Sequence, residues 1–142
     1  MRYMIVVKAT RESEAGVMPT AEMFEIMGKY HEELAQAGVL VDASGLQASA
    51  KGWRIDYQGE QRTVVDGPFA ETKEIIAGYT IIKVKSEAEA REWTRRFPNP
   101  SLNHGWGQIE VRRMFELKDF EPNAEIERFR NIPGNGRPAT GN

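Results

Sequence analysis

Two different spacings of apolar residues divide this chain into predicted strands and helices. Short runs rich in β-branched residues, such as Ile5-Val6-Val7, are typical of buried strands. Apolar residues three or four positions apart predict a helix with one buried face, and they occur at Met23, Met27, Tyr30 and Leu34. The elements predicted in chain order are a strand over 3–8, a loop over 10–18, a helix over 20–37, strands over 39–46, 53–57, 61–66 and 78–84, a helix over 86–97, a strand over 109–115 and a short helix over 122–130.

Capping residues and helix breakers set the ends of the two long helices. Thr20 is a favoured N-cap, and Gly38 ends the first helix because glycine adopts the left-handed conformation freely. Ser86 and Glu89 form a capping-box pattern at the start of the second helix. Pro98-Asn99-Pro100 ends that helix, since proline cannot continue it.

The order of elements predicts an α+β fold. Without the hairpin 53–66 the order is β-α-β followed by β-α-β, the split arrangement of ferredoxin-like domains. Two helices cover only one face of such a sheet, so we expect a second subunit to cover the other and form a dimeric α+β-barrel. One domain is expected over 1–118, with a C-terminal extension over 119–142 whose Gly- and Pro-rich end, 133–142, is predicted to be disordered.

Composition narrows the range of functions. Charged residues are 28% and hydrophobic residues 40% of the 142 residues, as in soluble globular proteins. A net charge of −2 gives no electrostatic reason to expect nucleic acid or an anionic membrane as partner. The apolar run at the N-terminus is too short for a signal segment or a membrane span. The absence of cysteine excludes disulfides and thiolate chemistry and fits the cytoplasm.

The sequence contains no motif for a metal or a cofactor. Its two histidines lack the spacing of metal-binding motifs. No glycine-rich loop precedes a predicted helix, and no serine nucleophile elbow occurs. We therefore expect neither a metal nor a cofactor.

Ionisable groups of both signs are concentrated in the segment 66–74, around a rigid Gly-Pro step. Asp66 is either a carboxylate aimed at a ligand or a turn residue that binds local N–H groups. Lys73 lies between Glu71 and Glu74 and forms either a solvated ion-pair cluster or a binding site for an anionic substrate. Gly67, Pro68 and Phe69 are expected to turn, stiffen and anchor the segment.

Four further residues are candidates for a site. His31 lies at the edge of the apolar stripe of the first helix, as a boundary residue or a catalyst. His104 lies in a loop, where a surface role is expected. Arg112 on the last strand requires a carboxylate partner, and Glu110 lies on the same face. Tyr79 follows the segment 66–74 as a ligand-binding candidate.

The segment Asp66-Gly67-Pro68-Phe69-Ala70-Glu71-Thr72-Lys73-Glu74, followed by Gly78-Tyr79, resembles the YCII-related proteins, specifically their DGPF-domain branch. Further similar stretches are Ala37-Gly38-Val39-Leu40, Gly45-Leu46 and Ile109-Glu110-Val111-Arg112, so that the resemblance covers about residues 1–118. It implies a ferredoxin-like fold, a dimeric α+β-barrel and a cleft under the first helix. It implies no known reaction. Genes of this largely uncharacterised branch often lie beside those of extracytoplasmic-function sigma factors.

The sequence departs from the family at one position that matters for catalysis. Related YCII proteins have been proposed as enzymes that use a histidine–aspartate pair, and one relative is a dechlorinating enzyme of chloroaromatic breakdown. His31 corresponds to the helix histidine, but Asn99 stands where the pair requires an aspartate. An amide neither accepts a proton near neutral pH nor stabilises an imidazolium by charge.

Two classes of function remain open. The first is a non-catalytic homodimer that binds a small molecule or acts in regulation, with a sigma-factor-linked partner. The second is a small lyase- or hydrolase-type enzyme that performs acid–base chemistry on a small anionic organic molecule, with His31, Asp66 and Lys73 as titrating groups and Glu71, Glu74, Tyr79 and Arg112 binding the ligand. The enzyme hypothesis requires the titrating groups to converge on one pocket.

Overall fold

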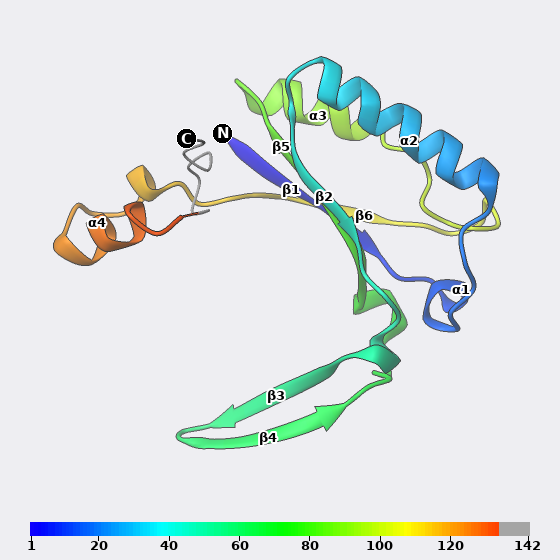
Figure 1. Ribbon diagram of the computed structural model, residues 1–142, viewed down its shortest axis with the longest axis horizontal. Coiled ribbons are helices and arrows are strands. Elements are labelled where there is room, and N and C mark those ends of the chain that lie inside the picture. The colour runs from blue at the N-terminus through cyan, green and yellow to red at the C-terminus, as the bar shows by residue number, and fades with distance from the viewer. Residues whose placement is uncertain (134–142) are drawn as a thin grey trace.

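The computed structural model describes residues 1–133, which form a four-stranded antiparallel sheet with the helices Ala21–Gln36 and Glu87–Arg95 on one face of it, and a projecting hairpin (Figure 1). The tail predicted to be disordered lies, apart from residue 133, outside the described residues. The strands are β1 Arg2–Lys8, β2 Leu40–Gly45, β3 Trp53–Gln58, β4 Gln61–Asp66, β5 Ile76–Lys83 and β6 Ile109–Arg113. The helices are α1 Arg11–Glu14, α2 Ala21–Gln36, α3 Glu87–Arg95 and α4 Ala124–Arg130, with 3₁₀ turns over Ser49–Lys51, Thr72–Glu74 and Leu117–Asp119.

The predicted α+β fold with an antiparallel sheet is confirmed. The strand order in the sheet is β2-β5-β1-β6, and every neighbouring pair is antiparallel. The strands β3 and β4 pair only with each other and form a separate two-stranded sheet. Among residues 1–133 there is no helix with the length and apolar character needed to cross a membrane.

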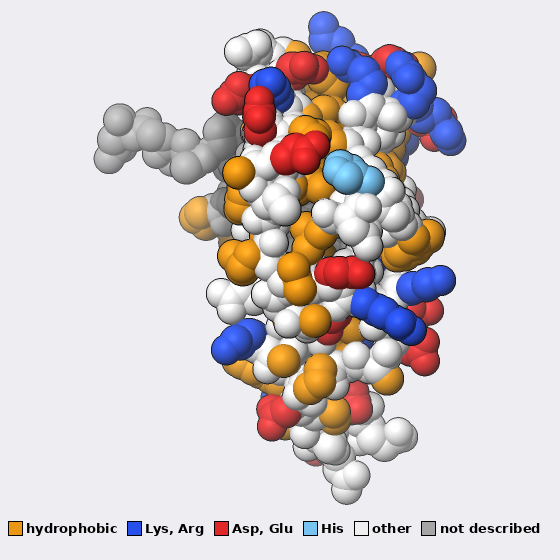
Figure 2. Space-filling model, turned by 90° about the vertical axis from the view of Figure 1, so that its right-hand side faces the viewer, with side chains coloured by type: hydrophobic (Ala, Val, Ile, Leu, Met, Phe, Trp, Pro, Cys, Tyr) orange, Lys and Arg blue, Asp and Glu red, His pale blue; other side chains and the backbone are white. Residues whose placement is uncertain are grey.

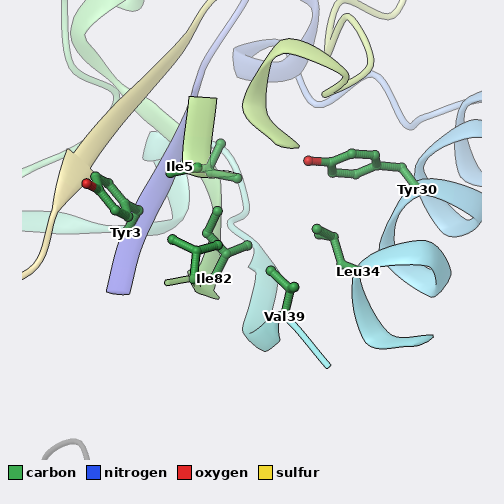
Figure 3. Close-up of a cluster of buried hydrophobic side chains, with 8 residues drawn as sticks. Tyr3, Ile5, Tyr30, Leu34, Val39 and Ile82 are labelled. Carbon is green, nitrogen blue, oxygen red and sulfur yellow. The ribbon is translucent and has the colours of Figure 1, made fainter. Parts of the chain in front are cut away.

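The hydrophobic core lies between α2 and the central strands of the sheet (Figure 3). Ile5 and Ile82 project from β1 and β5 toward Leu34 of α2, and the side chains of all three are fully buried. Complete burial of such a side chain contributes about 1.5–3 kcal/mol. The stripe of apolar residues predicted from the helical spacing is therefore the surface that holds α2 on the sheet.

The ends of α2 are set by the residues that the sequence indicates. The Thr20 hydroxyl accepts a hydrogen bond from the Met23 amide at 3.2 Å, and Gly38 has a φ of +71° after the last turn. Within the helix, the Tyr30 hydroxyl donates to the Trp93 carbonyl oxygen of α3 at 2.7 Å. Burial raises the pKa of Tyr30 to about 12, so this phenol stays a neutral donor and joins the two helices.

The other face of the sheet carries no helix among the described residues (Figure 1). Successive residues of a strand point to opposite faces, so the neighbours of Ile5 and Ile82 point away from the core. On this open face Met4 lies opposite Ile81 and Val6 lies opposite Tyr79. The centre of the open face is therefore apolar, and α4 and the hairpin β3–β4 project on the same side of the sheet (Figure 1).

The structure corrects the sequence prediction at two places. The segment 10–18 contains the short helix α1, whose capping box joins Thr10 and Ser13 through hydrogen bonds of 2.9 and 3.2 Å. The alternation of apolar and polar residues over 53–57 predicts a strand with one buried and one solvated face, yet all residues of β3 and β4 are exposed. The hairpin projects from the sheet, so nothing in the described chain covers its apolar face.

Replacing Leu34 by alanine tests the position of the core. Leu34→Ala removes a fully buried side chain and leaves a cavity, so we expect the free energy of unfolding to fall by about 3 kcal/mol in urea denaturation. The matched control is Leu46→Ala, because Leu46 is 50% exposed and its truncation is expected to cost less than about 1 kcal/mol. Equal losses in the two variants would contradict this core.

Candidate ligand-binding cleft

A cleft of about 880 Å³ lies between α2, the α1 segment and the ends of β2 and β5. This volume is within the range of small-molecule sites. Figure 2 looks onto the side of the molecule where α1 and α2 lie, and apolar side chains are exposed along that face between charged ones. The apolar residues that line the cleft include Val17, Met18, Met23, Met27, Leu46 and Phe97.

His31 lies in the wall of the cleft and is held by two hydrogen bonds. Its Nδ1 is 2.8 Å from the Met27 carbonyl oxygen, which can only accept, so Nδ1 carries a proton. Its Nε2 is 2.8 Å from the hydroxyl of Thr80, a residue that is 2% exposed. In the neutral ring Nε2 is therefore the basic nitrogen and accepts the threonine proton. His31 is thus fixed in one orientation on the sheet side of α2.

The lining residues of the cleft with a basic side chain are Lys8, Lys51 and His31, and none of the described lining residues is an aspartate or a glutamate. The Lys8 ammonium lies 3.8 Å from a carboxylate oxygen of Glu110, on the open face of the sheet and away from the cleft. No ion pair of Lys51 is found among residues 1–133, so Lys51 supplies the ammonium group of the cleft. The field in the cleft therefore favours an anionic group on a ligand.

Tyr79, which the sequence indicates as a ligand-binding candidate, is also among the lining residues. Its hydroxyl donates to the Asp42 carboxylate at 2.9 Å. This hydrogen bond raises the pKa of Tyr79, so the phenol remains protonated across the physiological range. The neighbouring Thr80 points to His31 on the cleft side, so the ring of Tyr79 points to the open face of the sheet and away from the cleft.

The remaining candidate residues lie outside the cleft lining. Asp66 is exposed at the end of β4, opposite Trp53. The Lys73 ammonium stands 5.1 Å from the centre of the Trp106 ring, where a cation–π contact holds it at the surface. The structure thus brings the side chain of His31 to the cleft. Tyr79 is among the lining residues, but its ring lies on the open face. Outside the lining are Asp66, Glu71, Lys73, Glu74 and Arg112.

Two of these outer residues have other surroundings. Glu74 lines a smaller hollow of about 460 Å³, together with Arg54 and Phe69. Arg112 pairs with Glu110 at 3.3 Å on the open face of the sheet, as the sequence suggested. Neither arrangement includes His31.

The segment 66–69 is a structural joint against the turn Ser49–Lys51. A Cβ atom on Gly67 would collide with the Ser49 carbonyl oxygen, so only glycine fits there. The Gly67 amide donates to the Gly52 carbonyl oxygen at 3.0 Å, and the Phe69 amide donates to the Ser49 hydroxyl oxygen at 3.1 Å. The peptide bond between Gly67 and Pro68 is cis. The Arg54 guanidinium lies 3.8 Å from the centre of the Phe69 ring.

Glu14 connects this joint to α1. Its carboxylate accepts from the Ser49 amide at 2.9 Å and from the Ser49 hydroxyl at 2.5 Å. Residues from α1 and from the turn both line the cleft, so this contact fixes the position of α1 relative to the turn. Glu14 could not be identified from the sequence, because no local pattern indicates a partner 35 positions away.

Asn99 has a structural role in the loop after α3. Its side-chain amide donates to the Gly105 carbonyl oxygen at 3.1 Å, and its oxygen accepts from the Ser101 amide at 2.9 Å. Both ends of the amide are therefore engaged by the backbone. His104 is exposed in this loop with a φ of +58°. In the part of the chain that the structure describes, no group of three or more His, Cys, Asp or Glu side chains could hold a metal ion.

Two comparisons with known proteins agree. The family model described as the YCII-related domain matches residues 1–118. An uncharacterised protein of Rhizobium meliloti (strain 1021) is 31% identical over 112 residues, which cover 79% of this chain and 84% of that protein.

The contact between Gly67 and Ser49 can be tested by one added methyl group. Gly67→Ala forces the Cβ against backbone atoms that cannot move cheaply, so we expect a loss of about 2 kcal/mol in the free energy of unfolding. In Gly52→Ala the Cβ meets the same carbonyl oxygen at 3.7 Å, an ordinary contact, and a change within about 0.5 kcal/mol is expected. Chemical denaturation measures both; an unchanged stability of Gly67→Ala would refute the tight joint.

Proposed function

The chain belongs to the YCII-related domain family, and from this premise we propose that it is a cytoplasmic homodimer that binds a small anionic organic molecule in the cleft beneath α2. Within the family we assign it to the DGPF branch, on the nine residues 66–74. The finer description of its fold as a ferredoxin-like split β-α-β unit is supported by the strand order, in which β5 lies between β1 and β2.

The observation that carries this proposal is the charge of the cleft. Lys51, which has no ion pair among residues 1–133, and His31 line it, and no carboxylate is among its described lining residues, although acidic residues outnumber basic ones in the whole chain. The rest of the lining is mainly apolar, with three methionines that adapt to irregular shapes. A ligand with one carboxylate or similar anionic group and an apolar body matches both parts of the lining.

The homodimer is supported by the open face of the sheet. Met4, Val6, Tyr79 and Ile81 form its apolar centre, while Asp42 and Arg112 lie toward its two edges. An apolar centre with a charged rim is the usual anatomy of a protein interface. Two such faces in contact would form the dimeric α+β-barrel. A ligand-binding dimer without turnover would also suit the regulatory role linked to sigma factors that the DGPF resemblance implies.

The enzyme is the second candidate, and His31 is the observation that favours it. His31 lies in the wall of the cleft and its Nε2 is a basic nitrogen, which could act as a general base once the hydrogen bond from the Thr80 hydroxyl is broken. Asp66 and Lys73 do not line this cleft. An enzyme that uses His31, Asp66 and Lys73 together would therefore need Asp66 and Lys73 from a partner subunit. Because the amide of Asn99 binds the backbone, no carboxylate at that position supports His31.

Binding of carboxylates, and its dependence on Lys51, tests whether the cleft takes an anionic ligand. A panel of small aromatic and aliphatic carboxylates is compared with the corresponding primary amides by thermal shift and calorimetry. We expect the acids to bind and the amides to bind much more weakly. Lys51→Gln should weaken binding of the best acid about five- to tenfold, since it removes one charge-assisted contact. Lys29→Gln, on the exposed pair with Glu25 outside the cleft, is the control. Equal binding of acids and amides would refute the proposal.

Turnover separates the two candidates. The acid that binds best is incubated with the protein and followed by proton NMR for several hours. As a binding protein the wild type should leave the ligand unchanged, and His31→Gln should still bind it. Conversion by the wild type that is lost in His31→Gln would instead establish the acid–base enzyme, because the variant lacks the imidazole in the described cleft lining.

A further inference from the structure

The hairpin β3–β4, which we call the arm, is the least covered part of the described chain. All residues of both strands are exposed, including large apolar ones. Trp53 is 65% exposed, Tyr57 62% and Val64 62%. An isolated two-stranded hairpin is marginal in water at best, because it needs a third strand or a packed surface to be stable. The arm therefore requires a cover that the described chain does not provide.

The apolar side chains of the arm are gathered on one of its faces. Residues directly opposite each other in an antiparallel pair point to the same side, and Ile55 lies opposite Val64. With Trp53 and Tyr57 two positions to either side of Ile55, these four form the apolar face of the arm. The same face also carries Asp66 and Arg62, and the Arg62 guanidinium lies 5.1 Å from the centre of the Tyr57 ring. Such one-sided distribution is typical of a sheet that packs on something.

The other face of the arm differs in character. It carries Arg54, Asp56 and Thr63, with Val65 as its large apolar residue. Arg54 is already occupied by the ring of Phe69, 3.8 Å from its guanidinium. This face is therefore expected to face solvent, apart from the contact of Arg54 with Phe69 at the base of the arm. Its residues provide matched control positions in the same two strands.

The surface area of the chain indicates how much of it is left for a partner. The chain exposes 10484 Å², whereas a compact monomer of 16.1 kDa exposes about 7,400 Å². Even with an upper bound of about 1,200 Å² for residues 134–142, roughly 2,000 Å² of excess remain for residues 1–133. A standard interface removes about 800 Å² from each partner. The excess is thus large enough for a stable dimer.

The arm and the open face lie on the same side of the molecule (Figure 1). One partner seated against the open face would therefore also meet the arm. The arm carries charges of both signs, including Arg54, Asp56, Glu60 and Arg62, which does not favour an anionic membrane. A second copy of the chain presents both an open apolar face and an arm. In a twofold-symmetric dimer the open face and the arm of both subunits would be buried.

We propose that the arm of each subunit packs its apolar face, Trp53, Ile55, Tyr57 and Val64, against the second copy of this chain. This inference rests on the homodimer of the proposed function and adds the element that holds it together. The arm is then stable only in the assembled dimer, and its apolar residues contribute to the interface rather than to the fold of one subunit.

Double substitution on the two faces of the arm tests this role. Trp53→Ser with Ile55→Ser removes the centre of the apolar face, and Thr63→Ser with Val65→Ser changes the opposite face. Light scattering after size exclusion gives the mass at a series of protein concentrations. We expect wild type and the control variant to be dimers and the first variant to dissociate, with a dimer dissociation constant at least about 100-fold higher. The helical circular dichroism is expected to stay near native in both, since the arm lies outside the core, whereas the dissociated variant should lose the β-sheet signal of the arm.

The outcomes separate the arm from the dimer. A monomeric wild type would overturn both the homodimer and the arm. A variant Trp53→Ser with Ile55→Ser that dimerises as tightly as wild type would overturn the arm alone. Capture of the arm by vesicles or another protein, with a monomeric chain, would also count against it. Ligand binding in the cleft is measured separately, so its failure leaves the dimer test unaffected.

A distance measurement gives a second readout. The chain has no cysteine, so Glu60→Cys at the tip of the arm provides a single site for a nitroxide label. Pulsed dipolar spectroscopy should give one narrow distance between the two labels of a dimer if each arm is docked. A broad distribution would mean that the arms are free in the dimer and would contradict the proposal.

Discussion

The packing of α2 on one face of the sheet is the contact on which the other features depend. Leu34, Ile5 and Ile82 are fully buried there, and the same contact sets the position of His31, because its ring bonds the Thr80 hydroxyl of the sheet. The start of α2 separates from the strand ends and creates the cleft. Since the helices cover a single face, the other stays open and apolar at its centre.

Local patterns were sufficient to predict most of the fold. The helical spacing of Met23, Tyr30 and Leu34, the cap Thr20 and the terminator Gly38 each act within a few residues, and the structure agrees with them. The hairpin is different, because its alternation indicates an apolar face but not what covers it. Helix α1 was missed because its capping box spans only Thr10 to Ser13.

The candidate site depended on distances that a sequence does not contain. His31 was identified by its position on the helix, and it lines the cleft. Tyr79 was identified by its place after the segment 66–74, and its ring lies on the open face of the sheet. Asp66 was a reasonable ligand from its place at a strand end, but the pairing with Trp53 carries it to the exposed hairpin. Lys8 and Lys51 were not singled out, because a lysine is ordinary until it lies beside a cavity. The contacts of Gly67 and Phe69 are those of a joint.

The joint couples the cleft to the arm, because the turn Ser49–Lys51 lines the cleft and also holds the base of the hairpin. The turn Ser49–Lys51 lies between the cleft and β3, with only Gly52 before the strand begins. Gly67 returns the second strand against that same turn. A ligand that displaced the turn would also change the orientation of the hairpin. By thermodynamic linkage, the factor by which the ligand changes the affinity of the hairpin for its binding partner equals the factor by which that partner changes the affinity for the ligand.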